Sequence, residues 1–181
     1  MNTNDEKAAL RGHYRQARLG SKENVSFDKL LEIPEILNSK IIASYFSYGN
    51  EPNTNEINRE LLSRGKKLIL PRIHGTNLEW CLWDGEKSTV ENKNGIFEPI
   101  GESFMKHDQI DCVIVPALAV DSSGTRLGKG KGFYDRALVT IKCFMVAMIY
   151  SEEYSEKPLP RDAHDVKINA AQTPEKLYRF S

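Results

Sequence analysis

Short apolar runs recur along the chain and predict buried strands. They cover residues 41–47, 67–71, 112–118 and 144–150. β-branched and aromatic residues, which favour extended backbone on a half-buried surface, are frequent in these runs. Residues 78–83 instead alternate between apolar and polar positions. This alternation predicts a further strand that carries Trp80 and Trp83 on opposite faces.

Amphipathic stretches precede and separate these runs. From residue 4 to about residue 19, apolar side chains recur at the spacing of a helix face. A separate basic stripe on the same stretch consists of Lys7, Arg11, Arg15 and Arg18. A second helical stretch opens at residue 26, and Pro34 either interrupts it or restarts it as a first-turn proline.

Capping residues mark the helix that follows the first apolar run. Asn53, with Glu56 three positions later, resembles a capping box, and the helix is expected to end at Gly65. Another helix is expected over about 133–141. The segment 84–109 between the predicted strands is polar and predicts mostly loop.

Strands that alternate with helices predict an α/β fold. We expect a three-layer, Rossmann-like arrangement with a mostly parallel central sheet and helices on both faces. Ligands of such folds bind outside the carboxyl ends of the strands, and the loops after residues 47 and 118 leave from such ends. Because no repeat, low-complexity tract or linker interrupts the pattern, residues 1–181 are expected to form a single domain.

The most distinctive motif is a glycine-rich basic segment between the third apolar run and the last predicted helix. Its glycines and cations are Gly124, Arg126, Gly128, Lys129, Gly130, Lys131 and Gly132. Closely spaced glycines let a backbone approach a ligand, and their exposed N–H groups form a concave anion site. The side-chain cations add full positive charge, so the segment predicts a phosphate-binding loop that leads into a helix.

This segment matches neither standard nucleotide fingerprint. A Walker A loop needs glycine five residues before its Gly-Lys pair and Ser or Thr after it, but Thr125 and Gly132 stand at those positions. The G-x-G-x-x-G spacing is absent as well. If the segment has no function, it is a mobile, solvated basic loop. The dense spacing of its glycines and the helix predicted directly after it favour a phosphate site instead.

Charge and cysteine usage narrow the class of protein. The 25 basic and 25 acidic residues cancel, so the overall field favours neither nucleic acid nor a membrane, and anion binding must be local. Cys81, Cys112 and Cys143 are widely spaced, which indicates free thiols in a reducing compartment. No apolar signal region is visible at the N-terminus, and no apolar run approaches the ~20 residues of a membrane span. We expect a cytoplasmic protein.

Several acidic and basic residues are candidates for a site near the phosphate loop, and each has a plain structural interpretation. Asp135 lies in the first turn of a predicted helix, where it suits the helix dipole, but it could also hold Mg²⁺ beside phosphates. Asp165 follows His164 in what could be an ordinary surface pair. Lys7 and Arg11 could be a solvated stripe, and Glu51 a surface acid in the loop after a buried strand.

Together these residues resemble the 5-formyltetrahydrofolate cyclo-ligase family over nearly the whole chain. Its pattern PG-(apolar)-x-F-D-x-x-G-x-R-L-G-x-G-(G/K)-G-Y-Y-D is matched at Pro116, Asp121, Gly124, Arg126, Leu127, Gly128, Gly130, Lys131, Gly132, Tyr134 and Asp135. Shorter matches are Lys7, Leu10 and Arg11; Glu51, Thr54 and Ile57; Pro71 and Arg72; Gly95, Ile96, Glu98 and Pro99; and 163–165.

The resemblance implies conversion of 5-formyltetrahydrofolate and MgATP into 5,10-methenyltetrahydrofolate, ADP and phosphate. A monomer is expected. It implies ATP contacts from Lys7, Arg11, Arg126, Leu127, Gly128, Lys129, Gly130, Lys131, Gly132, Phe133 and Tyr134. It implies folate contacts from Phe46, Glu51, Lys129 and Phe133, and Mg²⁺ ligation by Asp135 and Asp165. The catalytic residues would be Arg126, Lys131 and Tyr134.

The chain departs from the family pattern at a few positions. Phe133 replaces a tyrosine, Val120 a common phenylalanine, and Ala117 and Ala119 stand where glycine is usual. Asn169 occupies a position that is often acidic. These changes affect the expected substrate packing and metal binding but leave the phosphate loop intact.

Two other functions are compatible with a basic glycine-rich loop. A different small-molecule kinase or ATPase would bind ATP without folate, and the segment around Glu51 argues against it. An RNA-binding module would use Arg126, Lys129 and Lys131 and would bind in a strongly salt-dependent way. Zero net charge and the lack of an extended basic patch argue against that module.

Overall fold

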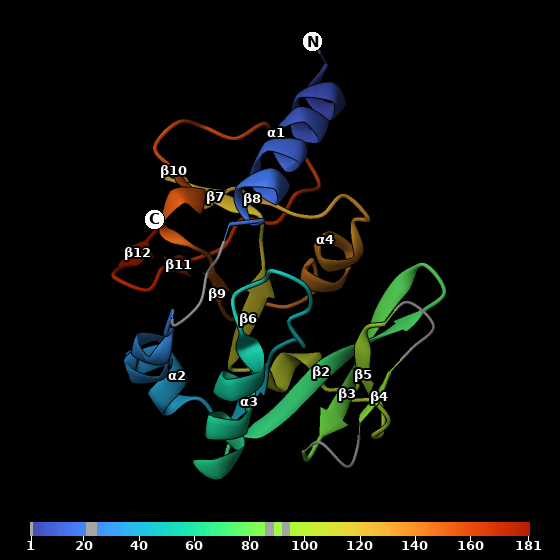
Figure 1. Cartoon of the computed structure of the whole chain (residues 1–181). Coiled ribbons are helices and arrows are strands. Elements are labelled where there is room, and N and C mark those ends of the chain that lie inside the picture. Colours follow the sequence, from blue (N-terminus) through green and yellow to red (C-terminus); the bar gives the residue numbers. More distant parts are fainter. Residues whose placement is uncertain (1, 21–24, 86–88, 92–94) are drawn as a thin grey trace.

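The computed structural model describes residues 2–20, 25–85, 89–91 and 95–181. Its centre is a seven-stranded sheet with the strand order β12-β11-β9-β6-β1-β2-β3. The parallel strands are β11 (Ala170–Gln172), β9 (Phe144–Met148), β6 (Cys112–Pro116), β1 (Ile41–Ala43) and β2 (Lys67–His74). Antiparallel edges are added by β3 (Asn77–Trp83) and β12 (Leu177–Arg179). The mostly parallel α/β sheet predicted from the sequence is confirmed (Figure 1).

Helices cover both faces of this sheet. One face packs against a 3₁₀ helix, η1 (Asp28–Glu32), and the helices α2 (Pro34–Asn38) and α3 (Thr54–Ser63). The other face packs against α4 (Phe133–Leu138). The N-terminal helix α1 (Thr3–Ala17) lies on a smaller third cluster, which contains Tyr14 and Leu127.

Neighbouring strand residues enter opposite cores, as the pleat of a strand requires. In β1, Ile42 belongs to the α3 side and Ala43 to the α4 side, and both are fully buried. In β3, Trp83 lies on the first side and Trp80 on the second, as the alternating pattern predicted. Burial of such large side chains stabilises the sheet by roughly 1.5–3 kcal/mol each.

The first predicted strand, 41–47, is shorter than expected and ends at Ala43. Beyond Ala43, side chains of α3 form hydrogen bonds with the backbone in place of a neighbouring strand. The carbonyl of Tyr45 accepts hydrogen bonds from Thr54 Oγ1 at 2.6 Å and from Asn58 Nδ2 at 2.9 Å. The chain therefore leaves the sheet early, and the segment that follows is held against α3 rather than against a strand.

A small second sheet follows β6 and includes the start of the glycine-rich segment. The sequence did not predict this sheet. The predicted strand 112–118 ends at Pro116, and β7 (Ala119–Asp121) then pairs with β8 (Arg126–Leu127) and β10 (Tyr154–Ser155). The Asp121 carboxylate closes the turn between β7 and β8 by accepting from the amides of Ser123 and Thr125. The glycine-rich segment thus begins on a hairpin and not directly on a strand of the main sheet.

Most other elements are confirmed with shifted ends. The first helix and the helix after Asn53 exist as α1 and α3, and Asn53 caps α3. The stretch from residue 26 is split into η1 and α2, with Pro34 in the first turn of α2. The predicted helix 133–141 and strand 144–150 are shorter, as α4 and β9. The strands β11 and β12 of the main sheet were not expected. Two paired strands, β4 (Thr89–Glu91) and β5 (Phe97–Pro99), and the 3₁₀ helices η3 (His107–Gln109) and η4 (Ser151–Glu153) were not expected either.

Two further expectations concern cysteines and membranes. The cysteines are free thiols, and Cys81 and Cys112 are buried. Among the helices of the described residues, none combines the length and the apolar character that crossing a bilayer requires.

Candidate active site

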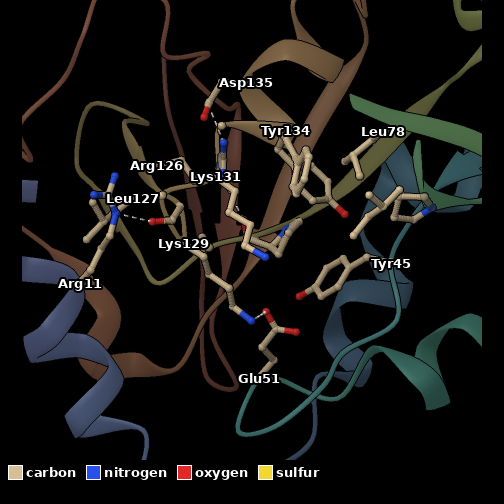
Figure 2. A pocket seen from close by; sticks show the side chains of 18 of the residues that line it. Arg11, Tyr45, Glu51, Leu78, Arg126, Leu127, Lys129, Lys131, Tyr134 and Asp135 are labelled. Atoms are coloured by element: carbon tan, nitrogen blue, oxygen red, sulfur yellow. Dashed lines mark hydrogen bonds and ion pairs between the residues drawn. The ribbon is translucent and has the colours of Figure 1, made fainter. Parts of the chain in front are cut away.

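A cavity of about 320 Å³ lies beside the glycine-rich segment, between α1, the loop after β1, β2–β3 and the loop before β11 (Figure 2). It contains every residue that the sequence singled out for the site: Lys7, Arg11, Phe46, Glu51, Arg126, Leu127, Gly128, Lys129, Gly130, Lys131, Gly132, Phe133, Tyr134, Asp135 and Asp165. The tertiary structure therefore brings together residues that lie as far apart in sequence as Lys7 and Asp165. Their individual roles stay predictions.

The glycine loop, residues 126–132, is held by arginines from α1. Arg11 Nε donates to the carbonyl of Gly128 at 3.0 Å, and Arg15 donates to the carbonyl of Lys129 at 2.9 Å. These bonds engage carbonyl oxygens of the loop on the α1 side. Gly132 caps α4 with a φ of 66°, and an added Cβ there would lie 2.7 Å from the Arg136 guanidinium. Because that conformation disfavours side chains, the turn from the loop into α4 needs glycine.

Lys131 is the exposed cation of this loop, and its side chain extends into the middle of the cavity in Figure 2. Among the described residues, its ammonium group has no hydrogen bond or ion pair. The other cations of the site are engaged with carboxylates or carbonyl groups. Lys131 is thus the cation best placed to meet an anionic ligand without first breaking a contact.

Lys129 joins the glycine loop to the loop after β1. Its Nζ lies 2.7 Å from Glu51 Oε1 and 3.6 Å from the centre of the Tyr48 ring. The Glu51 side chain is only 5% exposed and also accepts a hydrogen bond from the amide of Tyr48. The carboxylate is therefore fixed at the cavity wall, and its charge is balanced by Lys129 (Figure 2).

Arg126 is buried, with 7% of its surface exposed, and ties the start of α4 to the end of β6. It forms an ion pair of 2.6 Å with Asp135 and donates to the carbonyl of Pro116. Its Nε is buried without a hydrogen-bond partner among the described residues. A buried donor without a partner is energetically costly. The Arg126 Nε–H group is therefore available to donate a hydrogen bond to a ligand.

Tyr134 contributes a neutral hydroxyl beside these charges. Burial raises the pKa of Tyr134, and the nearby Glu51 carboxylate raises it further, so the phenol stays protonated. The ring packs edge-on against Trp80 with centroids 6.2 Å apart, and the Arg126 guanidinium lies 5.9 Å from its centre. The side chain is thereby oriented from two sides.

An acidic corner, formed by Asp162, His164 and Asp165, closes the cavity near α1. Their candidate ligand atoms lie within 4.8 Å of one another. Lys7 Nζ contacts both carboxylates and is 2.6 Å from Asp162 Oδ2. Burial acts to raise the pKa of Asp165, but the hydrogen bonds from Lys7 and the Asp162 amide outweigh it and lower the pKa. Asp165 is therefore ionised, and its oxygens are of the type that Mg²⁺ prefers.

Sequence reasoning missed some of the lining. Asp162 stands three residues before Asp165, a spacing that could have suggested a shared turn. Tyr45 was part of a predicted strand, and burial raises its pKa well above the usual value. The apolar wall from β2 and β3 includes Ile73 and Leu78, which nothing in the sequence distinguished from ordinary core residues.

Comparisons with known proteins give a consistent result. A sequence model of the 5-formyltetrahydrofolate cyclo-ligase family matches residues 5–174. The Escherichia coli 5-formyltetrahydrofolate cyclo-ligase is 28% identical over 160 residues, which cover 84% of this chain and 87% of the relative. The Mycolicibacterium smegmatis 5-formyltetrahydrofolate cyclo-ligase is 30% identical over 156 residues, which cover 77% and 76%.

A solved structure agrees with these relatives. The structure of Aquifex aeolicus 5,10-methenyltetrahydrofolate synthetase superposes with a TM-score of 0.84 at 31% identity, and the match covers 96% of this chain and 92% of that one. The family match spans nearly the whole chain, including the glycine loop, Glu51 and the acidic corner. The chain is an enzyme that belongs to the 5-formyltetrahydrofolate cyclo-ligase family.

Proposed function

We propose that this enzyme converts 5-formyltetrahydrofolate and ATP, with Mg²⁺, into 5,10-methenyltetrahydrofolate, ADP and phosphate. The observation that carries the proposal is that Lys131 and the glycine loop line the same cavity as Glu51, which Lys129 of that loop contacts. A phosphate site and a carboxylate suited to hydrogen bonds from a pterin would then lie next to each other. Direct transfer of a phosphoryl group between two substrates needs such proximity.

The chemistry explains why a ring closure would use ATP. A formamide oxygen is a poor leaving group, so the formyl oxygen first attacks the γ-phosphorus, and ADP leaves. The nitrogen at position 10 then attacks the activated formyl carbon, the carbon–oxygen bond breaks, and phosphate departs. Loss of the proton from that nitrogen completes the 5,10-methenyl ring.

In this scheme the glycine loop and Lys131 hold the phosphates and stabilise the charge on the transferring group. Lys7 and Arg11 act on the nucleotide from α1, and Arg126 and Tyr134 act where nucleotide and folate meet. Glu51 and Phe46 orient the pterin, with Lys129 and Phe133 at the same boundary. Protein groups of this kind accelerate phosphoryl transfer mainly through position and electrostatics.

Mg²⁺ fits the donors of the acidic corner. Asp165 and Asp162 offer carboxylate oxygens close together, and hard oxygen ligands are what this ion requires. Lys7 Nζ pairs with both carboxylates, so these contacts must open to admit the ion. When bound with ATP, the ion neutralises phosphate charge. Asp135 is a further ligand candidate, but its ion pair with Arg126 must open first, which contact between Arg126 and a phosphate would favour.

The direct test mixes the purified protein with 5-formyltetrahydrofolate and MgATP and follows the near-ultraviolet absorbance of methenyltetrahydrofolate. We expect the absorbance to rise only when folate, ATP and Mg²⁺ are all present, with one ADP formed per methenyl group. A flat trace from protein that still binds ATP in calorimetry would overturn the folate assignment. It would favour a phosphoryl-transfer enzyme with another small-molecule acceptor.

A further inference from the structure

A second cavity adjoins the first, and the reaction proposed above assigns no role to it. Its volume is about 300 Å³, and its lining consists of Phe46, Asn55, Arg59, Trp83, Thr89 and Phe97. Phe46 and Phe97 line both cavities. Phe97 is 47% exposed, so it forms a boundary that a long ligand could pass along. We call this second space the side cavity.

The inner end of the side cavity is aromatic. Phe46 meets Trp83 edge-to-face with centroids 5.4 Å apart, and it meets Phe97 at 6.3 Å. The Trp83 indole N–H donates to Thr89 Oγ1 at 2.8 Å, which fixes the orientation of that ring. Ring edges and faces presented in this way suit another aromatic ring.

The outer end is polar and lies on α3. Asn55 and Arg59 are one turn apart on this helix, and Arg59 Nε donates to the Asn55 carbonyl at 3.3 Å. The Asn55 Oδ1 atom is buried and has no hydrogen-bond partner among the described residues. A half-turn about χ2 exchanges the oxygen and the nitrogen of this amide, so the group can offer an acceptor to the cavity. Arg59 is exposed and cationic.

The lining of the side cavity therefore combines aromatic rings, two of which border the first cavity, with an amide and a guanidinium from α3. We propose that this site binds the p-aminobenzoyl-glutamate part of the folate, an inference that rests on the function proposed above. This part carries an aromatic ring, then an amide N–H, then carboxylates. The benzoyl ring would pack on Phe46 and Phe97, the amide N–H would bond to Asn55, and a glutamate carboxylate would pair with Arg59.

The experiment compares two substrates that both carry the nitrogen needed for ring closure. 5-Formyltetrahydrofolate has the glutamate, and 5-formyltetrahydropteroate lacks it. Arg59→Met should raise KM for the first about tenfold with kcat unchanged, since one charge-assisted bond is worth about that factor. It should change KM for the pteroate by less than about threefold. Asn55→Leu should show the same selectivity, because the pteroate also lacks the amide.

Arg64→Met is the matched control. Arg64 lies on the same helix and carries the same charge, but it pairs with Glu60 and lines neither cavity. It should leave KM for both substrates unchanged. If the wild type turns over 5-formyltetrahydrofolate but Arg59→Met has a normal KM, or raises KM equally for both substrates, the tail site is wrong while the proposed reaction stands. If the wild type turns over neither substrate, the proposed reaction itself fails.

Discussion

Lys131 is the single residue on which we expect phosphate binding in this cavity to depend most. Its ammonium group extends into the cavity, and it has no ion pair among the residues that the structure describes. Lys131→Met should lower kcat by about 10²–10³-fold, because a positioned charge that stabilises a transition state is worth that much. Steady-state kinetics on the folded variant would measure the loss.

The same experiment needs a charge-matched control. Lys142 is exposed and does not line the cavity, so Lys142→Met should have the kcat of the wild type. Neither variant should change the melting temperature greatly, because both side chains are exposed. A Lys131→Met enzyme with near-normal kcat would remove Lys131 from the mechanism.

Glu51 is the residue that we expect to separate folate binding from nucleotide binding. Its carboxylate is nearly buried and paired with Lys129. Glu51→Gln should raise KM for 5-formyltetrahydrofolate by about tenfold or more, because a charged acceptor is lost. ADP affinity should be unchanged or higher, since Lys129 is released. If calorimetry instead shows weaker ADP binding, Glu51 supports the glycine loop and not the pterin.

At the scale of elements, the turn between β7 and β8 anchors the glycine loop to the rest of the chain. Asp121 is fully buried and accepts from the amides of Ser123, Thr125 and Leu159. Burial acts to raise the pKa of Asp121, but these bonds outweigh it, and the pKa is lowered. Gly124, with a φ of 78°, completes the turn, where an added Cβ would lie 2.5 Å from the Ile168 carbonyl oxygen.

The lowered pKa predicts how this anchor responds to acid. Because the folded value lies below the usual 3.8, the carboxylate stabilises the fold above that pH, and the contribution is lost as the pH falls through the folded pKa. Asp121→Asn should cost about 2 kcal/mol at pH 7, since an amide cannot accept all three bonds. Denaturant unfolding at several pH values should show the difference shrinking below about pH 4. A difference that stays constant down to the acid transition would mean that the carboxylate charge is not the stabilising feature.

The position of helix α1 on the molecule is set by the contacts of its basic side chains. Lys7 contacts the acidic corner, while Arg11 and Arg15 bond to carbonyl groups of the glycine loop. Arg18 pairs with Glu153 and donates to the carbonyl of Ala117. Of the basic stripe seen in the sequence, Lys7 and Arg11 therefore line the cavity, Arg18 is buried against Glu153, and Arg15 stays exposed.

At the scale of the whole molecule, the cavity is a meeting point of distant segments. Its walls come from α1, the loop after β1, the glycine loop and the acidic corner. A ligand that contacts several of these segments binds only the folded chain, and it stabilises that state by mass action. At about 100 times Kd, MgADP should add about 2.7 kcal/mol, or roughly 5–10 °C in melting temperature.

Matched ligands make this thermal measurement specific. Adenosine, which lacks phosphates, should give a much smaller shift than MgADP at the same concentration. ADP with EDTA should give an intermediate shift if the acidic corner holds Mg²⁺ with the nucleotide. Equal shifts with and without EDTA would argue against a metal at Asp162 and Asp165.

Periodicity and spacing alone were enough to predict five strands of the main sheet and the phosphate loop, but not the strands β11 and β12. Apolar runs such as 112–118 are local signals, because the pleat and the helix repeat act over neighbouring residues. The glycines and cations of 124–132 are contiguous, so their anion-binding geometry follows from local backbone freedom. Resemblance to a family then added the distant members, including Lys7, Glu51 and Asp165.

Which of these groups meet depends on the tertiary structure. The early end of β1 depends on Thr54 and Asn58, and the pairing of Lys129 with Glu51 joins loops that are distant in sequence. The short strands β7, β8 and β10 are stabilised by pairing with one another. A pattern of two or three residues does not predict such pairing. Local patterns in the sequence were sufficient for most of the longer elements and for the chemistry of the glycine loop, because both depend on neighbouring residues. The partners, the cavities and the ionisation of Asp165 depend on contacts across the chain, which folding alone creates.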